Sequence, residues 1–247
     1  GNIYSDPTQV TFTKDYKKTF TIVCNKVVPE KSFVETPFIK ELKLPSKLLS
    51  DFHKKPMSVN AAVLLPKEYY TQPSRKFPVL FYVFGYGGDY HGLSGDTIGS
   101  APIDTIPCIE VALDGNCALG HSVYANSDNN GPWGDALVKE LIPALKNKFR
   151  CNGARFLAGH SSGGWTVLWL QTQYPATFAG CWSSSPDPVD FRNFQDVNLY
   201  NGENMFYGKD SSLRSVATVA GFIPWASQKQ AYQAENVIYR GEQMHSF

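Results

Sequence analysis

The stretch that decides the fold reads Arg155-Phe156-Leu157-Ala158-Gly159-His160-Ser161-Ser162-Gly163-Gly164-Trp165. A short apolar run meets a Gly-x-Ser-x-Gly pentad, and the next segment carries apolar residues at helical spacing until Pro175 ends it. This order predicts a strand, a sharp turn and a helix. In that context the turn lifts the Ser161 hydroxyl out of the backbone above the helix amino terminus. Glycine fits at positions 159 and 163 because a β-carbon there would collide with the neighbouring strand or helix.

The pentad also has a plainer interpretation, a Gly/Ser-rich loop that matches by accident. The predicted strand before it and helix after it favour a nucleophile. A serine hydroxyl reacts poorly until a base removes its proton, so Ser161 needs a histidine and usually a carboxylate that orients it. The chain should therefore offer both partners.

The expected chain order in an α/β hydrolase is serine, acid, histidine. His245 is the one histidine downstream of Ser161, and it lies near the end of the sequence without a strand pattern around it. Asp187 and Asp190 follow a predicted strand and are possible acids, although the prolines beside Asp187 also fit a simple turn. His160 should diverge from its neighbour at a tight turn, so we interpret it as a packing or hydrogen-bonding residue.

A glycine-rich turn, Gly85-Tyr86-Gly87-Gly88, follows the most apolar run of the chain, Phe77 to Phe84. The run predicts a central strand that is covered on both faces. A turn of this kind upstream of the serine is where an α/β hydrolase places the second donor of its oxyanion hole. The candidate donors are the amides of Tyr86 and Ser162; the alternative is a loop that merely turns the chain.

The polar loop Ser122 to Gly134 is expected on the face that carries Ser161, because it follows the predicted strand Ile109–Leu113. Tyr124 and Trp133 are therefore candidates for lining the substrate cleft, and packing explains them equally well. A helix is predicted from Gly134 to Phe149, with a kink at Pro143.

Other segments give weaker patterns. Residues Thr8 to Val28 alternate as two strands would, and Lys47 to Phe52 suggests irregular β structure. Further strands are expected at 57–65 and 178–184, and a short helix near Gln228 to Ala234. Residues 192–247 otherwise lack a clear period and resemble an insertion or cap.

Composition narrows the function classes. The 247 residues fit one large α/β domain, with 43% hydrophobic and 18% charged residues. The net charge of +1 includes no basic stripe, so nucleic-acid binding has no electrostatic basis. No apolar run is long enough to span a membrane. The five cysteines show no metal-ligand spacing with histidine, so no metal and no cofactor is expected.

Together the motifs resemble the putative esterase family of α/β hydrolases, the group related to esterase D, feruloyl esterases and mycolyltransferases. Four segments carry this resemblance: residues 159–165, the loop 125–135, the turn 85–88 and the block 182–191. The resemblance implies an α/β fold with a mostly parallel sheet and helices on both faces. It also implies a serine hydrolase of carboxylic esters, with Ser161 as the nucleophile and the amides of Tyr86 and Ser162 as the oxyanion hole. Similar members are often exported, which implies an extracellular or periplasmic location.

This chain departs from the family pattern in its acid and its histidine. In the family these two residues come from two more strands beyond the insertion, and this sequence shows no such strand pattern. We therefore expect a truncated chain. The expected division is a β-rich N-terminal extension over residues 1–57, a hydrolase core over 58–191, and an insertion or cap over 192–247.

Two alternatives to an esterase stay open. One is a non-catalytic domain that binds carbohydrate, suggested by the aromatic content of 14% and the missing base. The other is acyl transfer, which shares the intermediate and differs in the acceptor. The expected substrate is a small-molecule or carbohydrate-linked ester, and the sequence leaves the oligomeric state open.

Overall fold

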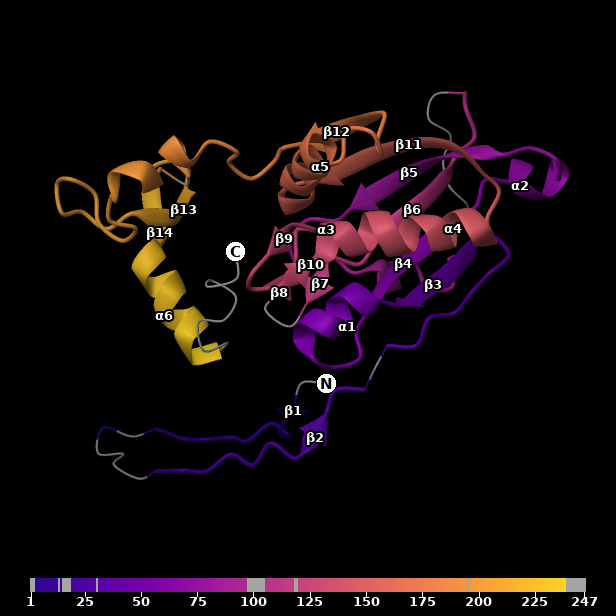
Figure 1. Ribbon diagram of the computed structural model, residues 1–247. Helices are drawn as coiled ribbons and strands as arrows, with labels where there is room; N and C mark the ends of the chain where they lie inside the picture. The colour runs from indigo at the N-terminus through magenta and orange to yellow at the C-terminus, as the bar shows by residue number, and fades with distance from the viewer. Residues whose placement is uncertain are drawn as a thin grey trace.

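The computed structural model describes residues 3–12, 14, 19–29, 31–96, 105–117, 120–194 and 196–238. Its centre is a six-stranded sheet in the order β12-β11-β5-β6-β4-β3 (Figure 1). The strands are β3 (Ile39–Pro45), β4 (Ser58–Leu64), β5 (Phe77–Val83), β6 (Ile109–Leu113), β11 (Cys151–His160) and β12 (Gly180–Ser184). β12, β11, β5 and β6 pair in parallel, whereas β4 is antiparallel to both of its neighbours. The predicted mostly parallel α/β sheet is confirmed, and the antiparallel strands β3 and β4 make it a mixed sheet.

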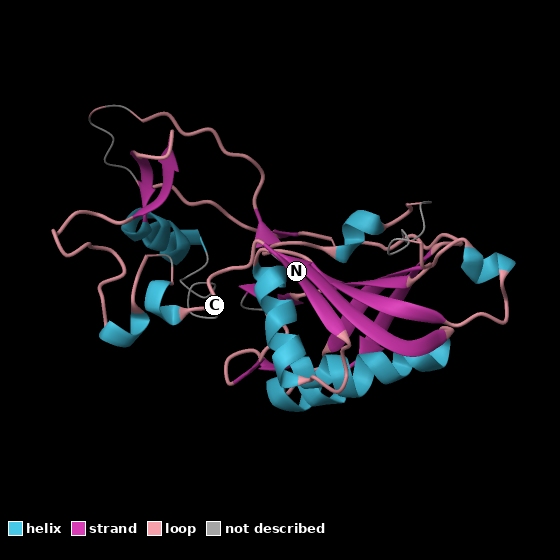
Figure 2. Ribbon diagram, turned by 90° about the horizontal axis from the view of Figure 1, so that it is seen from above, coloured by secondary structure: helices cyan, strands magenta, loops and turns pink. Residues whose placement is uncertain are grey.

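The longer helices lie along one face of the sheet (Figure 2). They are α1 (Lys47–His53), α3 (Trp133–Ala136), the π-helical turn η2 (Leu137–Leu141), α4 (Ile142–Lys148) and α5 (Ser162–Gln173). The π-helical turn precedes Pro143, whose missing N–H cannot continue the regular ladder, so the predicted kink occurs as a change of helix type. The opposite face is covered by the 3-10 helix η1 (Tyr90–Leu93) and by Phe33 and Phe38.

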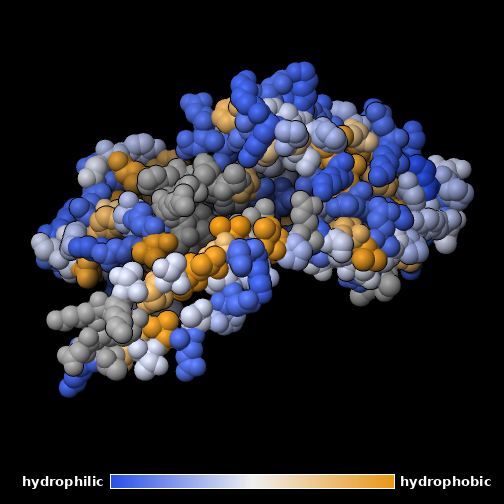
Figure 3. All heavy atoms as spheres, turned by 90° about the horizontal axis from the view of Figure 1, so that it is seen from below, coloured by the Kyte–Doolittle hydropathy of each residue, from blue (hydrophilic) through white to orange (hydrophobic). Residues whose placement is uncertain are grey.

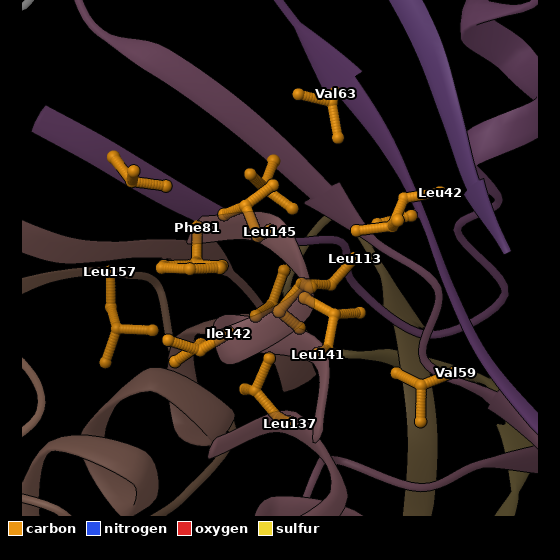
Figure 4. Close-up of a cluster of buried hydrophobic side chains, with 14 of the residues drawn as sticks. Leu42, Val59, Val63, Phe81, Leu113, Leu137, Leu141, Ile142, Leu145 and Leu157 are labelled. Carbon is orange, nitrogen blue, oxygen red and sulfur yellow. The ribbon is translucent and has the colours of Figure 1, made fainter. Parts of the chain in front are cut away.

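The main core lies between the sheet and these helices (Figure 4). On β5, Val79, Phe81 and Val83 point into it and are essentially fully buried. They meet Leu137, Leu141, Ile142 and Leu145 from the helical side. Because β5 is central and apolar on both faces, it fixes the level at which β11 ends and the next turn begins.

Two segments differ from the sequence prediction. Residues Lys47–His53 form α1 rather than β structure, because Ser46 caps the helix by accepting a hydrogen bond from the Leu49 amide at 3.1 Å. Between Thr8 and Val28 the described residues hold one short strand, β2 (Lys26–Val27), which pairs with β1 (Ile3–Tyr4). Phe12 and Phe20 of this arm are exposed, and their rings contact each other with centroids 6.2 Å apart. Figure 3 shows hydrophobic residues on the surface of the molecule seen from below.

The remaining elements are small. α2 (Glu68–Thr71) precedes β5, and four short strands, β7 (Asn116–Cys117), β8 (Gly120–His121), β9 (Asn126–Ser127) and β10 (Gly131–Pro132), follow β6. The downstream segment holds η3 (Phe191–Asn193), η4 (Leu199–Asn201), the hairpin β13 (Ser215–Val219) with β14 (Ile223–Ser227), and α6 (Gln228–Ile238). The hairpin and α6 stand to one side of the sheet (Figure 1). The helix expected near Gln228 is therefore present.

The sheet extends beyond the segment that we assigned to the core. β3 pairs with β4 along its whole length, from Ile39 opposite Leu64 to Pro45 opposite Ser58.

No helix within the described ranges has the length and apolar character needed to cross a bilayer. Within the same ranges no group of histidine, cysteine and carboxylate side chains is placed to hold a metal ion.

Candidate active site

The turn at Ser161 joins β11 to α5 in one residue, as predicted. Ser161 has φ 58° and ψ −125°, a backbone conformation that L-residues rarely adopt. Backbone hydrogen bonds hold it there. Its amide donates to the Ser184 carbonyl at 3.0 Å, and its carbonyl accepts from the Trp165 amide at 3.1 Å. Strain of this kind persists only where the surroundings determine the backbone, which makes the turn a candidate functional position.

Close backbone approach explains the glycines of the pentad. A β-carbon on Gly159 would overlap the carbonyl of Gly163. One on Gly163 would overlap the carbonyl of Val83 and lie 2.6 Å from that of Phe84. The expected collisions with the neighbouring strand and helix are therefore confirmed. α5 can start directly against the carboxyl end of β5 because these positions lack side chains.

The Gly85–Gly88 turn lies beside the Ser161 side chain. The Gly88 amide donates to the Gly85 carbonyl at 2.9 Å, and Gly87 has φ 75°. A β-carbon on Gly85 would lie 3.3 Å from the Ser161 β-carbon and 3.8 Å from its hydroxyl oxygen. The structure thus brings this turn and Ser161 together at the carboxyl ends of β5 and β11.

The two predicted oxyanion donors are the residues that directly follow Gly85 and Ser161. Tyr86 follows Gly85, and its side chain is 52% exposed. Ser162 is the first residue of α5, so its amide has no helical acceptor one turn earlier. Its side chain is fully buried. The oxyanion role of both amides stays a prediction.

Asp187 is the carboxylate that reaches the candidate nucleophile. The Ser161 hydroxyl donates to Asp187 Oδ1 at 3.5 Å, and the Asp187 amide donates to the Ser161 carbonyl at 3.3 Å. Burial raises the pKa of Asp187 above its ordinary value, and the hydrogen bond from Ser161 opposes that shift. Asp190 is engaged elsewhere, because Arg192 holds it at 2.6 Å and its hydrogen bonds lower the pKa of this exposed group to about 2.

The histidines within the described residues make their contacts away from the Ser161 hydroxyl. His160 Nδ1 lies 3.4 Å from Ser184 Oγ, which agrees with a hydrogen-bonding residue rather than a base. His91 Nδ1 lies 2.7 Å from Asp89, and His121 is buried. His245, the candidate from the sequence, lies outside the described residues.

A cavity of about 310 Å³ opens beside Asp187. One wall comes from the loop after β8, and another comes from Trp165 on α5. Three residues of the downstream segment close it. The lining residues are Ser122, Val123, Ala125, Ser127, Asn130, Trp165, Asp187, Phe191, Phe194 and Leu199. Because Asp187 contacts Ser161 Oγ, the cavity lies next to the hydroxyl.

Tyr124 and Trp133 anchor the loop wall. Both side chains are in the main core, with ring centroids 5.9 Å apart and the rings edge to face. The Tyr124 hydroxyl donates to the Asp114 carbonyl at 2.6 Å, and Trp133 Nε1 donates to the Asn130 carbonyl at 2.8 Å. Their neighbours in the loop line the cavity instead. Contact of these two rings with substrate stays a prediction.

Sequence reasoning missed part of the wall. Phe191 ends the block 182–191, and Phe194 and Leu199 follow it with no motif of their own. They line the cavity together with Trp165 and the loop after β8, which are distant in sequence. Trp165 did carry a signal, because a residue one helical turn after Ser161 lies on the side of α5 nearest the turn.

The chain is similar to one known family and to several solved structures. Residues 54–244 match the family model described as "Putative esterase". No curated protein matches the sequence. A solved S-formylglutathione hydrolase from Agrobacterium tumefaciens has 16% identity and a TM-score of 0.50, covering 64% of this chain and 62% of its own. The ferulic acid esterase AmCE1/Fae1A from Anaeromyces mucronatus has 18% identity and a TM-score of 0.45, covering 65% of this chain and 62% of its own.

A third similar structure is FphF, a fluorophosphonate-binding serine hydrolase from Staphylococcus aureus. It has 18% identity and a TM-score of 0.46, with coverage of 80% of this chain and 74% of its own. The chain thus spans less than two thirds of the length of the first two structures. At 16% identity and a TM-score of 0.50, the similarity to the S-formylglutathione hydrolase shows the fold alone.

Proposed function

We propose a function from one premise: this chain belongs to the putative esterase family, whose model matches residues 54–244. The proposal is that Ser161 attacks the carbonyl carbon of a carboxylic ester and forms an acyl-enzyme, which water then hydrolyses. The observation that carries it is the position of the Ser161 hydroxyl. It stands at a strained turn between β11 and α5, next to the cavity and the Gly85–Gly88 turn.

A backbone oxyanion hole completes this proposal. Attack at the carbonyl places a negative charge on its oxygen, and backbone N–H groups that point there stabilise that charge in the transition state. The amides of Tyr86 and Ser162 are the proposed donors. The Ser162 amide also lies at the amino terminus of α5, where the helix dipole favours negative charge.

The cavity supports an acyl group that is largely apolar. Val123, Ala125, Trp165, Phe191, Phe194 and Leu199 supply apolar wall, and Asp187 is its charged lining residue. We propose that the acyl portion of a small-molecule or carbohydrate-linked ester occupies this cavity and that the alcohol leaves toward solvent. An extracellular or periplasmic location remains a prediction from family resemblance.

The test compares wild type with Ser161→Ala on p-nitrophenyl acetate and on a fluorophosphonate probe. We expect covalent labelling of Ser161 in wild type, and loss of both labelling and turnover in the variant. Ser74→Ala is the matched control, because Ser74 is exposed and far from Ser161 in sequence. It should label and turn over like wild type. Turnover that survives Ser161→Ala would refute the proposal.

The same assay addresses the two alternatives. If wild type and Ser161→Ala are equally inert while a glycan binds both, a non-catalytic carbohydrate-binding domain is the better account. Acyl transfer is identified by adding an alcohol or a glycan acceptor, because it gives an acylated acceptor in place of free acid.

A further inference from the structure

Asn130 is a buried polar residue in a cavity wall that is mostly apolar. It stands between β9 and β10, is 4% exposed, and lines the cavity beside Asp187. Buried amide groups in proteins nearly always have hydrogen-bond partners. The partners of Asn130 therefore show which of its polar atoms serve the fold and which one is left for a ligand.

The fold uses the backbone of Asn130 and one end of its side chain. The backbone amide donates to Ser127 Oγ at 3.0 Å, and the carbonyl accepts from Trp133 Nε1 at 2.8 Å. The side-chain Oδ1 accepts from Cys117 Sγ at 3.5 Å. Within the described residues, none of the hydrogen bonds of Asn130 involves Nδ2. The cavity wall thus contains an amide donor that has no acceptor among these residues.

The neighbouring helix holds this donor in place. The Asn130 carbonyl also lies 3.0 Å from His53 Nε2 of α1. A β-carbon on Gly131, which has φ 88°, would lie 2.8 Å from Phe52 Cδ1 of the same helix. The turn that carries Asn130 is therefore packed closely against α1. A donor that the fold already fixes can bind an acceptor without the entropic cost of ordering a mobile side chain.

An acyl group made only of hydrocarbon would bind unfavourably at this point. It would exclude water from Nδ2 and leave the N–H groups of Asn130 unpaired. An acyl group with an oxygen there would pair the donor and still contact the apolar walls at Trp165 and Phe191. Ligand cavities commonly combine apolar walls with a few placed polar groups in this way.

We infer that Asn130 selects esters whose acyl group carries a neutral acceptor oxygen, such as a ketone or ether oxygen, in an otherwise apolar chain. The inference rests on the proposed function, because it requires the acyl group to occupy this cavity. The oxygen must be neutral because Asp187 lines the same cavity, and its carboxylate would repel an anionic acyl group.

The test compares matched pairs of p-nitrophenyl esters. One ester of each pair has a keto group at the γ, δ or ε carbon of the acyl chain, and the other has a methyl group in place of that oxygen. Wild type should favour the keto ester in kcat/KM for at least one pair. Asn130→Leu should shift the ratio for that pair by about tenfold toward the methyl ester, because the donor is gone. A wild-type enzyme that favours the methyl ester in every pair would overturn the inference, as would a ratio that Asn130→Leu leaves within twofold of wild type.

Two further variants show that the donor itself sets the ratio. Asn129→Leu is the matched control, because Asn129 is exposed and is not among the residues that line the cavity. Its ratio should stay within about twofold of wild type. Asn130→Asp keeps an oxygen for Cys117 and replaces the donor by a carboxylate oxygen, so its ratio should move toward the methyl ester at least as far as that of Asn130→Leu. Both esters of a pair meet the same enzyme sample, so the amount of folded protein cancels.

A binding measurement separates recognition from chemistry. The primary amides of the same acids are titrated by calorimetry into Ser161→Ala, which lacks the proposed nucleophile. The keto amide should bind about tenfold more tightly than the methyl amide, and adding Asn130→Leu should remove the difference. Equal affinity, or no binding of either amide, overturns the inference, and the proposed function stands if Ser161→Ala has lost turnover. A difference that depends on Asn130 supports the inference even where turnover survives Ser161→Ala, in which case only the proposed function falls.

Discussion

Two turns near the cavity hold residues with side chains at positive φ, and they are held by different means. Ser161, at φ 58°, is fixed by backbone hydrogen bonds and by glycines packed against strand carbonyls. Val123 and Tyr124, at φ 45° and 47°, are fixed by buried side chains. His121 Nδ1 accepts from the Val123 amide at 3.0 Å, and the Tyr124 ring fills the core.

The difference separates two kinds of constraint. At Ser161 the neighbours are main chain and cannot move without breaking the central sheet, so the nucleophile is set by the fold itself. At Val123 the neighbours are side chains, which can tilt or change charge. We therefore expect the loop wall of the cavity to respond to smaller perturbations, including pH, and to do so gradually.

The largest effect is expected for Gly163→Ala, which tests the backbone constraint. Its β-carbon would overlap the Val83 carbonyl at the carboxyl end of the central strand β5. Because backbone on both sides would have to shift, we expect a loss of more than about 4 kcal/mol in the free energy of unfolding, or no soluble protein. Urea unfolding measures this.

Gly180→Ala is the control for that change, since a β-carbon there meets nothing within 4 Å. It should lie within about 0.5 kcal/mol of wild type. A Gly163→Ala protein as stable as Gly180→Ala would contradict the close approach of α5 to β5.

Lowering the pH should reduce the free energy of unfolding, because His121 in the loop wall is protonated more readily in the unfolded chain. Burial lowers the pKa of His121 to about 4, whereas an unfolded histidine titrates near pH 6.5. Between these values the unfolded chain binds a proton that the folded chain does not, so stability falls as the pH drops. The contribution lost from about pH 7 to 4 is on the order of 3 kcal/mol.

Urea midpoints at several pH values measure this loss. His121→Asn keeps an acceptor for the Val123 amide without the titration, so its stability should depend less on pH. If both proteins show the same slope, His121 is not the source of the pH dependence.

An intermediate effect is expected for Gly115→Ala. A β-carbon there would overlap the His121 ring, with Cε1 at 2.6 Å. The ring must tilt and lose the Val123 amide, which should cost about 1–3 kcal/mol and raise KM by distorting the cavity wall. Gly92→Ala, which meets nothing within 4 Å, is the control. An unchanged KM would show that the loop wall does not depend on His121.

The smallest effect is expected for Tyr124→Phe, which keeps the buried ring and removes the 2.6 Å hydrogen bond to the Asp114 carbonyl. We expect a loss of about 1 kcal/mol in thermal or urea unfolding. Tyr200→Phe, at a residue 73% exposed, should have no measurable effect. A loss of several kcal/mol for Tyr124→Phe would mean that a hydrogen bond, rather than the ring, holds this turn.

The elements that sequence predicted well are those whose signal is local. The apolar run of β5, the pentad at Ser161 and the glycine turn at Gly85 each carry their own pattern, and each occurs where expected. The error at Lys47–His53 was avoidable in part, because Ser46 is a good helix cap. The helix also depends on Glu140, which accepts from the Leu48 amide at 3.0 Å across the fold.

The cavity could not be predicted because its walls come from distant segments. Phe191 and Phe194 line the cavity together with Trp165 of α5 and the loop after β8, and no spacing in the sequence records that these segments meet. Tyr124 and Trp133 illustrate a different limit of sequence analysis. The loop that holds them was predicted on the face that carries Ser161, but the sequence could not tell which of its side chains enter the core and which line the cavity. Burial decides that, and burial is a property of the whole fold.

The parallel pairing of β5, β11 and β12 has a consequence for how the protein reaches its native state. These strands deliver Gly85, Ser161 and Asp187 to one place, although each is separated from the next in the chain by a crossover. Contacts of this kind form late, because long loops must close first. During refolding, reactivity toward a fluorophosphonate should therefore return after collapse and helix formation, so probe capture reports the slowest event of assembly.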